Sequence, residues 1–278
     1  MRSGVKSSAG TPFSVKLGIF AASLGLFIVV WEVAALSAGN SLIIVGPVPV
    51  LQALISLLQN HLPGGTLGIQ GADDAILQTL ATILFGFILA CAVGIPVGLV
   101  MGRWKKAEML IDPWLSAAYS IPIVILIPML YFAIGADFFA EVFVTFLITV
   151  STIIVNTHHG VKYVSNALAE VGKSYGASER QFMAKIILPA SMPDIISGMR
   201  IGMGRAILAA VLAEVLLSGN GLGGMMMTFQ DVLDTPYMMA VVLLIALMGI
   251  AVLQLPKLLE RRLFRWREME SLSRGIGR

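Results

Sequence analysis

Charged residues are scarce in this sequence. Only 13% of its 278 residues are Asp, Glu, Lys or Arg, and its mean hydropathy is +0.88. A soluble globular domain typically carries about 25% charged residues. So little charge leaves too few polar groups to cover the surface of a water-soluble domain, and a membrane protein is therefore expected.

Cysteines and metal-binding clusters are equally scarce. The single cysteine, Cys91, stands in an apolar run, which excludes a disulfide framework and indicates a packing role. His158 and His159 are adjacent, and neighbours on a helix point about 100° apart, so they form a poor metal pair. Met225–Met227 suggests a soft-metal site, but packing of a short helix explains it better. Because no nucleophile–base pair stands in the apolar runs, we predict no enzyme activity, metal or cofactor on this chain.

Six apolar stretches are long enough to cross a membrane. A spanning helix needs about 20 largely apolar residues. The six stretches are Leu17–Ala38, Ile76–Met101, Pro113–Ile134, Phe138–Val155, Ile196–Leu217 and Met238–Leu255. We therefore predict an all-α membrane protein with six transmembrane helices.

Lysine and arginine are missing from every second connection between these stretches. Residues 39–75, 135–137 and 218–237 contain neither. With six spans, all 19 Lys and Arg residues fall on one side, and cytoplasmic loops carry the excess of such residues. The pattern predicts that both termini are cytoplasmic. The opposite side then receives Asp73, Asp74, Asp137, Glu141, Asp231 and Asp234.

The apolar segment 41–60 must then stay on the outer side, because another crossing would turn the later cations outward. Two prolines suit the start of a helix here. We predict an amphipathic surface helix over Pro47–Leu62. Its apolar residues at helical spacing are Val50, Leu51, Leu54, Leu57 and Leu58.

Residues 156–195 form the longest polar stretch on the basic side. Gly172-Lys173-Ser174 looks like the end of a phosphate-binding loop, but Ala167 stands where that motif needs its first glycine. We expect instead two short amphipathic helices separated by Gly176, the second capped by Ser178. Pro189 and Pro193 are expected to end the second helix. The two apolar stripes are Leu168, Val171 and Tyr175, and Phe182, Met183, Ile186 and Ile187.

The spacing in this stretch carries a family resemblance. Glu170-Val171-Gly172, Gly176 and Ile186-Ile187-Leu188-Pro189 resemble the Glu-Ala-Ala loop of permease subunits of bacterial ABC importers, which work with a substrate-binding protein. Val171 and Gly172 replace the two alanines. The runs similar to the branch that transports nitrate, sulfonates and taurine are Gly94-Ile95-Pro96-Val97-Gly98, Ile121-Pro122 with Pro128, and Gly219-Asn220-Gly221-Leu222-Gly223.

The resemblance implies a type I importer permease of the bacterial inner membrane. It implies an N-terminal cytoplasmic segment 1–16, a permease domain 17–260 with a coupling loop 162–192, and a basic tail 261–278 that contacts anionic lipid rather than nucleic acid. The implied partners are two ATPase subunits, a second permease copy that forms a homodimer, and an extracytoplasmic substrate-binding protein. ATP hydrolysis is expected on the separate ATPase subunits.

In such proteins the loop is a coupling helix that sits in a cleft of the ATPase. By resemblance, Glu170 and Gly176 lie at the contact, with Gly172 in the same turn. Lys173 and Arg180 are expected to meet an acidic rim of the cleft. The residues expected to fill the cleft are Leu168, Val171 and Tyr175.

The implied mechanism is alternating access along a solute path. Pro122 and Pro128 are expected to loosen the third span, and an interrupted helix in a membrane is tolerated where it is buried or lines a cavity. We predict that Tyr119, Ser120 and Tyr131 line the path. Two interpretations of Glu214 stay open, because it either lines the path or hydrogen-bonds a neighbouring helix. Arg200 and Arg205 are expected near the cytoplasmic end of their span.

Gly86, Gly94, Gly98 and Gly102 recur at spacings of four and eight along the second span, which favours close helix packing. The alternative function is a stand-alone, ion-coupled secondary transporter. Such transporters carry inverted repeats and ionisable residues at the midplane. The sequence has no clear repeat and no relay of Asp, Glu and His there, and it therefore favours the ABC permease.

Overall fold

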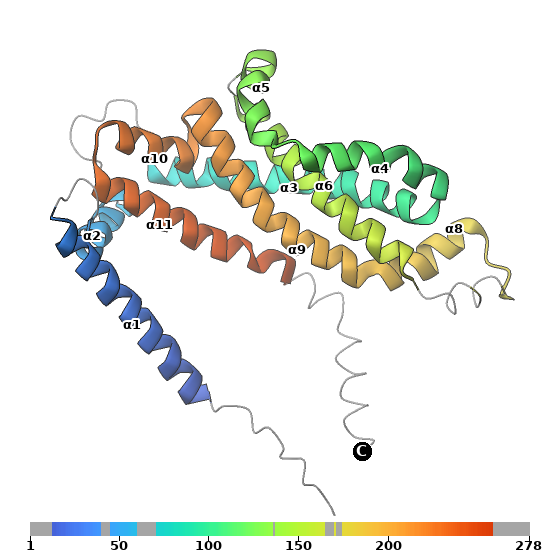
Figure 1. Ribbon diagram of the computed structural model, residues 1–278, viewed down its shortest axis with the longest axis horizontal. Coiled ribbons are helices and arrows are strands. Elements are labelled where there is room, and N and C mark those ends of the chain that lie inside the picture. The colour runs from blue at the N-terminus through green and yellow to red at the C-terminus, as the bar shows by residue number, and fades with distance from the viewer. Residues whose placement is uncertain are drawn as a thin grey trace, which may run out of the picture.

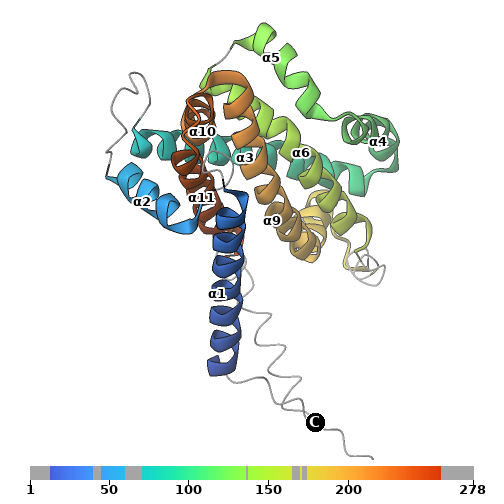
Figure 2. The ribbon, with the colours of Figure 1, turned by 60° about the vertical axis from the view of Figure 1, so that its left-hand side comes forward.

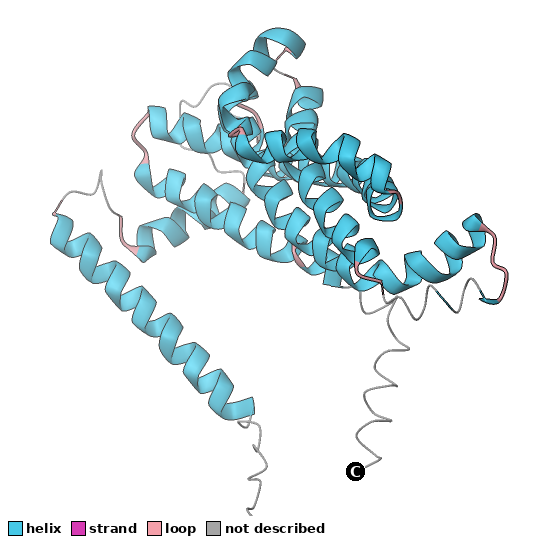
Figure 3. Cartoon of the chain, turned by 45° about the vertical axis from the view of Figure 1, so that its right-hand side comes forward, coloured by secondary structure: helices cyan, strands magenta, loops and turns pink. Residues whose placement is uncertain are grey.

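The computed structural model describes residues 13–39, 45–59, 71–135, 137–164, 170 and 174–257. Every regular element among them is a helix (Figure 3). The longer helices are α1 (Phe13–Ala38), α2 (Pro47–Leu58), α3 (Ala72–Arg103), α4 (Lys105–Ser120), α6 (Phe138–Lys162), α9 (Leu188–Ala213), α10 (Gly221–Asp231) and α11 (Thr235–Val252). The shorter ones are η1 (Ile123–Leu126), α5 (Ile127–Ile134), α8 (Glu179–Phe182) and the π-helical η2 (Met183–Ile187) and η3 (Glu214–Ser218).

The described helices offer four to six spans, a range that includes the predicted six. Four helices are long and apolar enough to cross a membrane, and the number rises to 6 if each of two bent pairs counts as one span. One pair joins α4 to the segment Ile123–Ile134 with a bend of 81°, at the predicted break beside Pro122. The other joins Glu179–Leu217 to α10 with a bend of 49°. The chain is thus an all-α membrane protein, as predicted.

Helices α3, α6 and α9 form the centre of the bundle and lie side by side in two views (Figures 1 and 2). The predicted glycine face of α3 is the surface that α6 packs against. A Cβ atom added to Gly86, Gly94, Gly98 or Gly102 would lie under 3.0 Å from a side chain of α6. The residues met are Thr145, Ile153, Thr157 and Val161 in that order, so α3 and α6 run parallel in one constant register.

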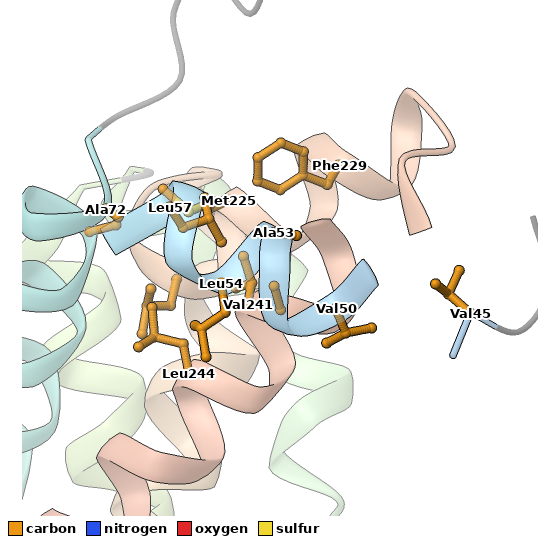
Figure 4. Packing of buried hydrophobic residues seen from close by; sticks show 13 residues of the cluster. Val45, Val50, Ala53, Leu54, Leu57, Ala72, Met225, Phe229, Val241 and Leu244 are labelled. Atoms are coloured by element: carbon orange, nitrogen blue, oxygen red, sulfur yellow. The ribbon is translucent and has the colours of Figure 1, made fainter. Parts of the chain in front are cut away.

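A second cluster packs α2 onto α10, α11 and the start of α3 (Figure 4). The predicted surface helix is present, but its buried face differs from the prediction. Leu51 and Leu58 are exposed, whereas Ala53 is buried. Positions 50, 53, 54 and 57 follow helical spacing as a single stripe, and Leu51 and Leu58 stand beside it. The buried residues of α2 are Pro47, Val50, Ala53, Leu54 and Leu57.

The first half of helix α1 projects from the bundle (Figure 2), whereas Phe27, Trp31 and neighbouring residues of its second half lie beside α11. It begins at Phe13, ahead of the predicted span, and no residue of its most apolar stretch is buried. Its link to the rest of the chain is near its end, where Trp31 Nε1 donates a hydrogen bond of 2.9 Å to the carbonyl oxygen of Val45. Residues 1–12 and 258–278, which include the predicted basic tail, lie outside the described part of the chain.

Candidate coupling segment and solute path

The predicted bend and cap of the coupling segment are both present. Gly176 has φ +65°, a left-handed conformation that glycine adopts without a Cβ clash. Ser178 caps α8 in a reciprocal pair, because its hydroxyl accepts from the Gln181 N–H and the Gln181 side chain accepts from the Ser178 N–H. The start of α8 is therefore fixed by four consecutive residues.

The prediction that Pro189 and Pro193 end the helix after Ser178 is wrong, because the helix continues past both prolines. Helices α8, η2 and α9 follow one another from Glu179 to Ala213 with helical backbone at each junction. Pro189 stands in the first turn of α9, directly after the π-helical turn Met183–Ile187. A π-turn shifts the hydrogen-bond register, and such local adjustments let a helix accommodate proline. The part of the predicted coupling loop that begins at Glu179 is thus continuous with a membrane span.

The underside of this helix packs on the ends of α3 and α6. Phe182 and Ile187 are buried against Val161, and Leu99 and Met183 are partly buried against the same cluster. This confirms the predicted stripe Phe182, Met183, Ile186 and Ile187. The segment after the bend is therefore held firmly to the bundle.

The upper side of the segment, which carries Glu170, Tyr175 and Arg180, is exposed. Tyr175 is 87% exposed, and Glu170 and Arg180 are also exposed. Leu168, Val171, Gly172 and Lys173 lie outside the described residues, so their predicted roles stay predictions.

Arg103, at the end of α3, holds the coupling segment through two contacts that the sequence analysis missed. Its Nε donates to Glu179 Oε1 at 2.7 Å, and its Nη2 donates to Glu179 Oε2 at 3.1 Å. Its guanidinium carbon also lies 5.1 Å from the centre of the Phe182 ring. Glu179 lies beyond the apolar spans, and the adjacent Arg103 holds the pKa of its carboxyl below the usual value.

A second ion-pair group joins α4 to α6 at the same end. Glu108 lies 2.6 Å from Lys162 Nζ, 3.0 Å from Lys105 Nζ and 3.4 Å from His158 Nε2. Glu108 stands in the charged connection before the third apolar span, where hydrogen bonds from Lys162 and Lys105 lower its pKa to about 2. We call the end that carries Arg103, Lys105 and Lys162 the basic end of the bundle.

The predicted path residues lie at the bend of the third span. Tyr119 and Ser120 end α4 just before the break, and both are exposed. Tyr131 belongs to α5, and its side chain is outside the described part. The guanidinium carbon of Arg205, on α9, lies 5.3 Å from the centre of the Tyr119 ring.

Arg205 lies deeper in the bundle than we had predicted. It shares a cavity of about 160 Å³ with Tyr119, Ile148 and Ser151. Ser151 stands midway along α6, so Arg205 is level with the middle of that helix rather than with the basic end. The continuous helix from Glu179 sets this depth, because it adds several turns before the apolar part of α9.

Glu214 is fully buried and faces the first turn of α10. Its Oε2 accepts a hydrogen bond of 2.9 Å from the N–H of Gly223, and a Cβ on Gly221 would collide with its carboxylate. The Leu222 N–H donates to Thr79 Oγ1 at 2.9 Å, which ties the same turn of α10 to α3. These contacts favour the interpretation that Glu214 hydrogen-bonds a neighbouring helix, here α10. That Glu214 also lines the solute path stays a prediction.

Glu141, predicted on the side opposite the basic residues, is another buried carboxylate, in the first turn of α6. It is fully buried in α6 and accepts a hydrogen bond of 3.0 Å from Thr82 Oγ1. Thr82 and Glu141 are 59 residues apart, which is the register of the glycine contacts between α3 and α6. Extending the glycine face by one turn would have placed Thr82, and hence Glu141, at this interface.

The solved structures that resemble this chain are transporter subunits. A chain of the methionine ABC transporter MetNI, in an inward-facing conformation, matches with a TM-score of 0.61 and 17% identity. The match covers 68% of this chain and 94% of that one. At this identity the likeness shows the fold alone, and it agrees with the predicted type I permease architecture.

The relatives by sequence are permeases. A probable ABC transporter permease of Brucella abortus is 34% identical, over 84% of this chain and 90% of its own length. The nitrate import permease of a Synechocystis strain is 32% identical, over 73% of each chain. The taurine transport system permease of Escherichia coli is 27% identical, over 92% of each chain.

A family profile covers the larger part of the sequence. Residues 94–265 match the profile described as the binding-protein-dependent transport system inner membrane component. The matched region includes the parts of α3, α6 and α9 that form the basic end and the coupling segment. Together with the helical fold and its apolar spans, this match shows that the chain belongs to the family of inner-membrane permease components of binding-protein-dependent ABC transport systems.

Proposed function

We propose that this chain forms the translocation path of an ATP-driven importer for a small solute of the nitrate, sulfonate or taurine type. A substrate-binding protein delivers the solute, and two separate ATPase subunits supply the energy. The path opens alternately to the two sides of the membrane. The nitrate and taurine permeases among its relatives support this class of solute.

The observation that carries the proposal is the coupling segment. Its upper side is exposed, whereas its underside is packed against α6 and paired with Arg103. It continues without interruption into α9, which lines the cavity beside Tyr119. A push on Arg180 would therefore be transmitted along the helix from Glu179 to Ala213 to the path, and a push on Tyr175 would reach that helix through the Gly176 bend.

The charges support a cytoplasmic position for this end. The basic end carries Arg103, Lys105 and Lys162, whereas the connections on the opposite side contain no Lys or Arg. Such an excess of basic residues is the property of cytoplasmic loops. We propose that both termini are cytoplasmic, and that the basic tail after Lys257 contacts anionic lipid.

We further propose that two copies of the chain enclose the path. Tyr119 and Arg205 are exposed in the single chain, and the cavity beside them is open on one side. A second copy against this face would close the path. A native mass that contains one permease copy with its ATPase subunits would contradict the homodimer.

Substitution of Gly176 tests the coupling. A side chain at φ +65° is strained, so Gly176→Val is expected to abolish ATP-driven uptake in proteoliposomes while the chain still inserts in the membrane. Gly176→Asn should retain more activity, because asparagine tolerates this conformation better. No atom of this chain lies within 4 Å of an added Cβ, so a loss reflects backbone geometry or a clash with the ATPase subunit rather than a clash within the chain.

The matched control is Gly18→Val on α1, which also has open space around it and should transport normally. Uptake by Gly176→Val at the wild-type rate would contradict the coupling role. Uptake driven by an ion gradient in the absence of any ATPase subunit would contradict the importer itself and favour a secondary transporter.

A further inference from the structure

Arg205 is a cation in the apolar part of a membrane span. It is level with Ser151, midway along α6, and stands within the apolar stretch 196–217. An arginine at the centre of a spanning helix costs about 2.5–3.5 kcal/mol on insertion scales. It must therefore face protein or water, and such residues mark ion or solute pathways.

No described carboxylate compensates this charge. The ion pairs in the described part of the chain involve Arg103, Lys105, His158 and Lys162, and none involves Arg205. The buried carboxylates Glu141 and Glu214 bond to Thr82 and to Gly223 instead. The interaction that Arg205 does make is with the face of the Tyr119 ring, at 5.3 Å. A ring face orients a guanidinium but leaves its N–H donors unused.

The surroundings of Arg205 provide space for a small solute. The cavity of about 160 Å³ is far larger than the roughly 10–15 Å³ that one water needs. Ser151 adds a hydroxyl, whose bond to the Ile148 carbonyl is long at 3.5 Å. The remaining wall is apolar. The residues that form it include Ile121, Ile123, Val124, Leu208 and Leu212.

We propose that Arg205 and Tyr119 form a binding site for the anionic group of the transported solute, at mid-depth in the membrane. The site takes a planar or tetrahedral oxyanion, such as nitrate, a sulfonate or a carboxylate, because a guanidinium fork can donate two parallel hydrogen bonds to it. The inference rests on the proposed function, because it presumes that a solute passes this face. It adds the residue that recognises the charge of the solute.

The geometry separates Arg205 from the nearby Arg200. The two positions lie about 140° apart around the helix. Arg200 does not line the cavity and makes no ring contact in the described structure. Arg200→Gln is therefore a control that removes the same charge from the same helix without touching the site.

The test measures anion binding directly in the full transporter. In a Cys91→Ser background, Leu208→Cys places one thiol on the cavity wall. The complex with its ATPase subunits, in proteoliposomes, is labelled with an anionic and a cationic methanethiosulfonate reagent. Labelling is repeated with ethanesulfonate and with the uncharged ethyl methyl sulfone, which has a similar shape.

We expect the anionic reagent to be favoured and ethanesulfonate, but not the sulfone, to protect the thiol. Arg205→Gln should lower the ratio of anionic to cationic labelling rates about tenfold and abolish protection. Arg205→Lys should keep the ratio and lose part of the protection, because an ammonium lacks the planar fork. Arg200→Gln should leave both unchanged.

Three results would overturn the site: equal protection by sulfonate and sulfone, unchanged protection in Arg205→Gln, or no labelling of the thiol by either reagent. Co-purification of the ATPase subunits and ATP-driven uptake are measured on the same samples. If these persist while the anion effects are absent, the inference fails and the importer stands. If the ATPase subunits do not bind even to wild type, the proposed function fails as well.

Discussion

Helices α1 and α6 have nearly the same mean hydropathy, yet their surroundings are opposite. No residue in the most apolar stretch of α1 is buried, whereas half of the corresponding stretch of α6 is. The difference follows from small residues at helical spacing. Gly86, Gly94, Gly98 and Gly102 of α3 let α6 approach closely, whereas Gly18 and Gly25 of α1 face open space. Hydropathy therefore indicates an apolar environment, and the glycine spacing indicates which helix provides it.

The largest expected effect comes from filling the contact between α3 and α6. In Gly98→Leu the new side chain meets Thr157 and lies close to the backbone oxygen of Ile154, which cannot move aside. Overpacking of this kind typically costs about 1–3 kcal/mol even for smaller additions. We expect loss of the folded protein in detergent, measured by size-exclusion chromatography and thermal aggregation.

Gly25→Leu is the matched substitution on α1, where nothing lies within 4 Å. It should leave the elution profile and the aggregation temperature unchanged. If Gly25→Leu is as damaging as Gly98→Leu, then α1 is packed in the assembled transporter, and the contrast between the two helices holds for the single chain only.

A second expected effect concerns α2, where the sequence and the structure assign different faces. Leu57 is fully buried, so Leu57→Ala is expected to destabilise the protein by about 2–5 kcal/mol. Leu51 is 51% exposed, and Leu51→Ala should change the stability by much less. If both variants lower the unfolding temperature equally, then Leu51 is buried as well, and the broader apolar face that the sequence predicted is correct.

The sequence was sufficient to find the apolar spans and, after them, the Gly176 bend and the Ser178 cap. About 20 apolar residues are needed to cross a bilayer, and this requirement located the apolar stretches, although the helix of the third begins at Lys105 and that of the fifth at Glu179. Gly176 and Ser178 were identifiable because a left-handed bend and a helix cap each need a particular residue type. These features are set by local chemistry, which a sequence displays directly.

The sequence was insufficient where contacts with neighbouring helices determine the length of a helix or the burial of a side chain. A proline normally ends a helix, but the π-turn Met183–Ile187 lets the helix continue through Pro189. No residue type in the sequence predicts that π-turn. The depth of Arg205 followed from this missed continuity. The burial of Glu141 depends on Thr82 of another helix, and it could be inferred only by extending the register of the glycine contacts.

A third, smaller effect is expected for the first turn of α10, which Glu214 holds. Glu214→Ala leaves the buried N–H of Gly223 without its acceptor, which costs about 1–3 kcal/mol. Glu214→Gln keeps an oxygen at that position and should lose less. Asp231→Ala, an exposed carboxylate at the end of α10, is the control. If Glu214→Ala unfolds at the wild-type temperature, the hydrogen bond does not hold the start of α10.

The smallest effect on stability, but an informative one for coupling, is expected for Arg103. Its pair with Glu179 is partly exposed, with side-chain exposures of 32% and 52%, and exposed pairs contribute about 0–1 kcal/mol. Arg103→Glu should therefore leave thermal unfolding nearly unchanged. It should nevertheless reduce ATP-driven uptake, because the repelled Glu179 loosens the start of α8 from α3.

The reversed pair decides between a mechanical role and a simple loss of charge. Arg103→Glu combined with Glu179→Arg restores the attraction and should recover uptake, although Phe182 loses its cationic neighbour. Lys106→Glu, an exposed charge of the same connection, is the control and should transport normally. A double variant that transports no better than Arg103→Glu would mean that Arg103 does not act through Glu179, and that the packing of Phe182 and Ile187 alone connects the coupling segment to α3 and α6.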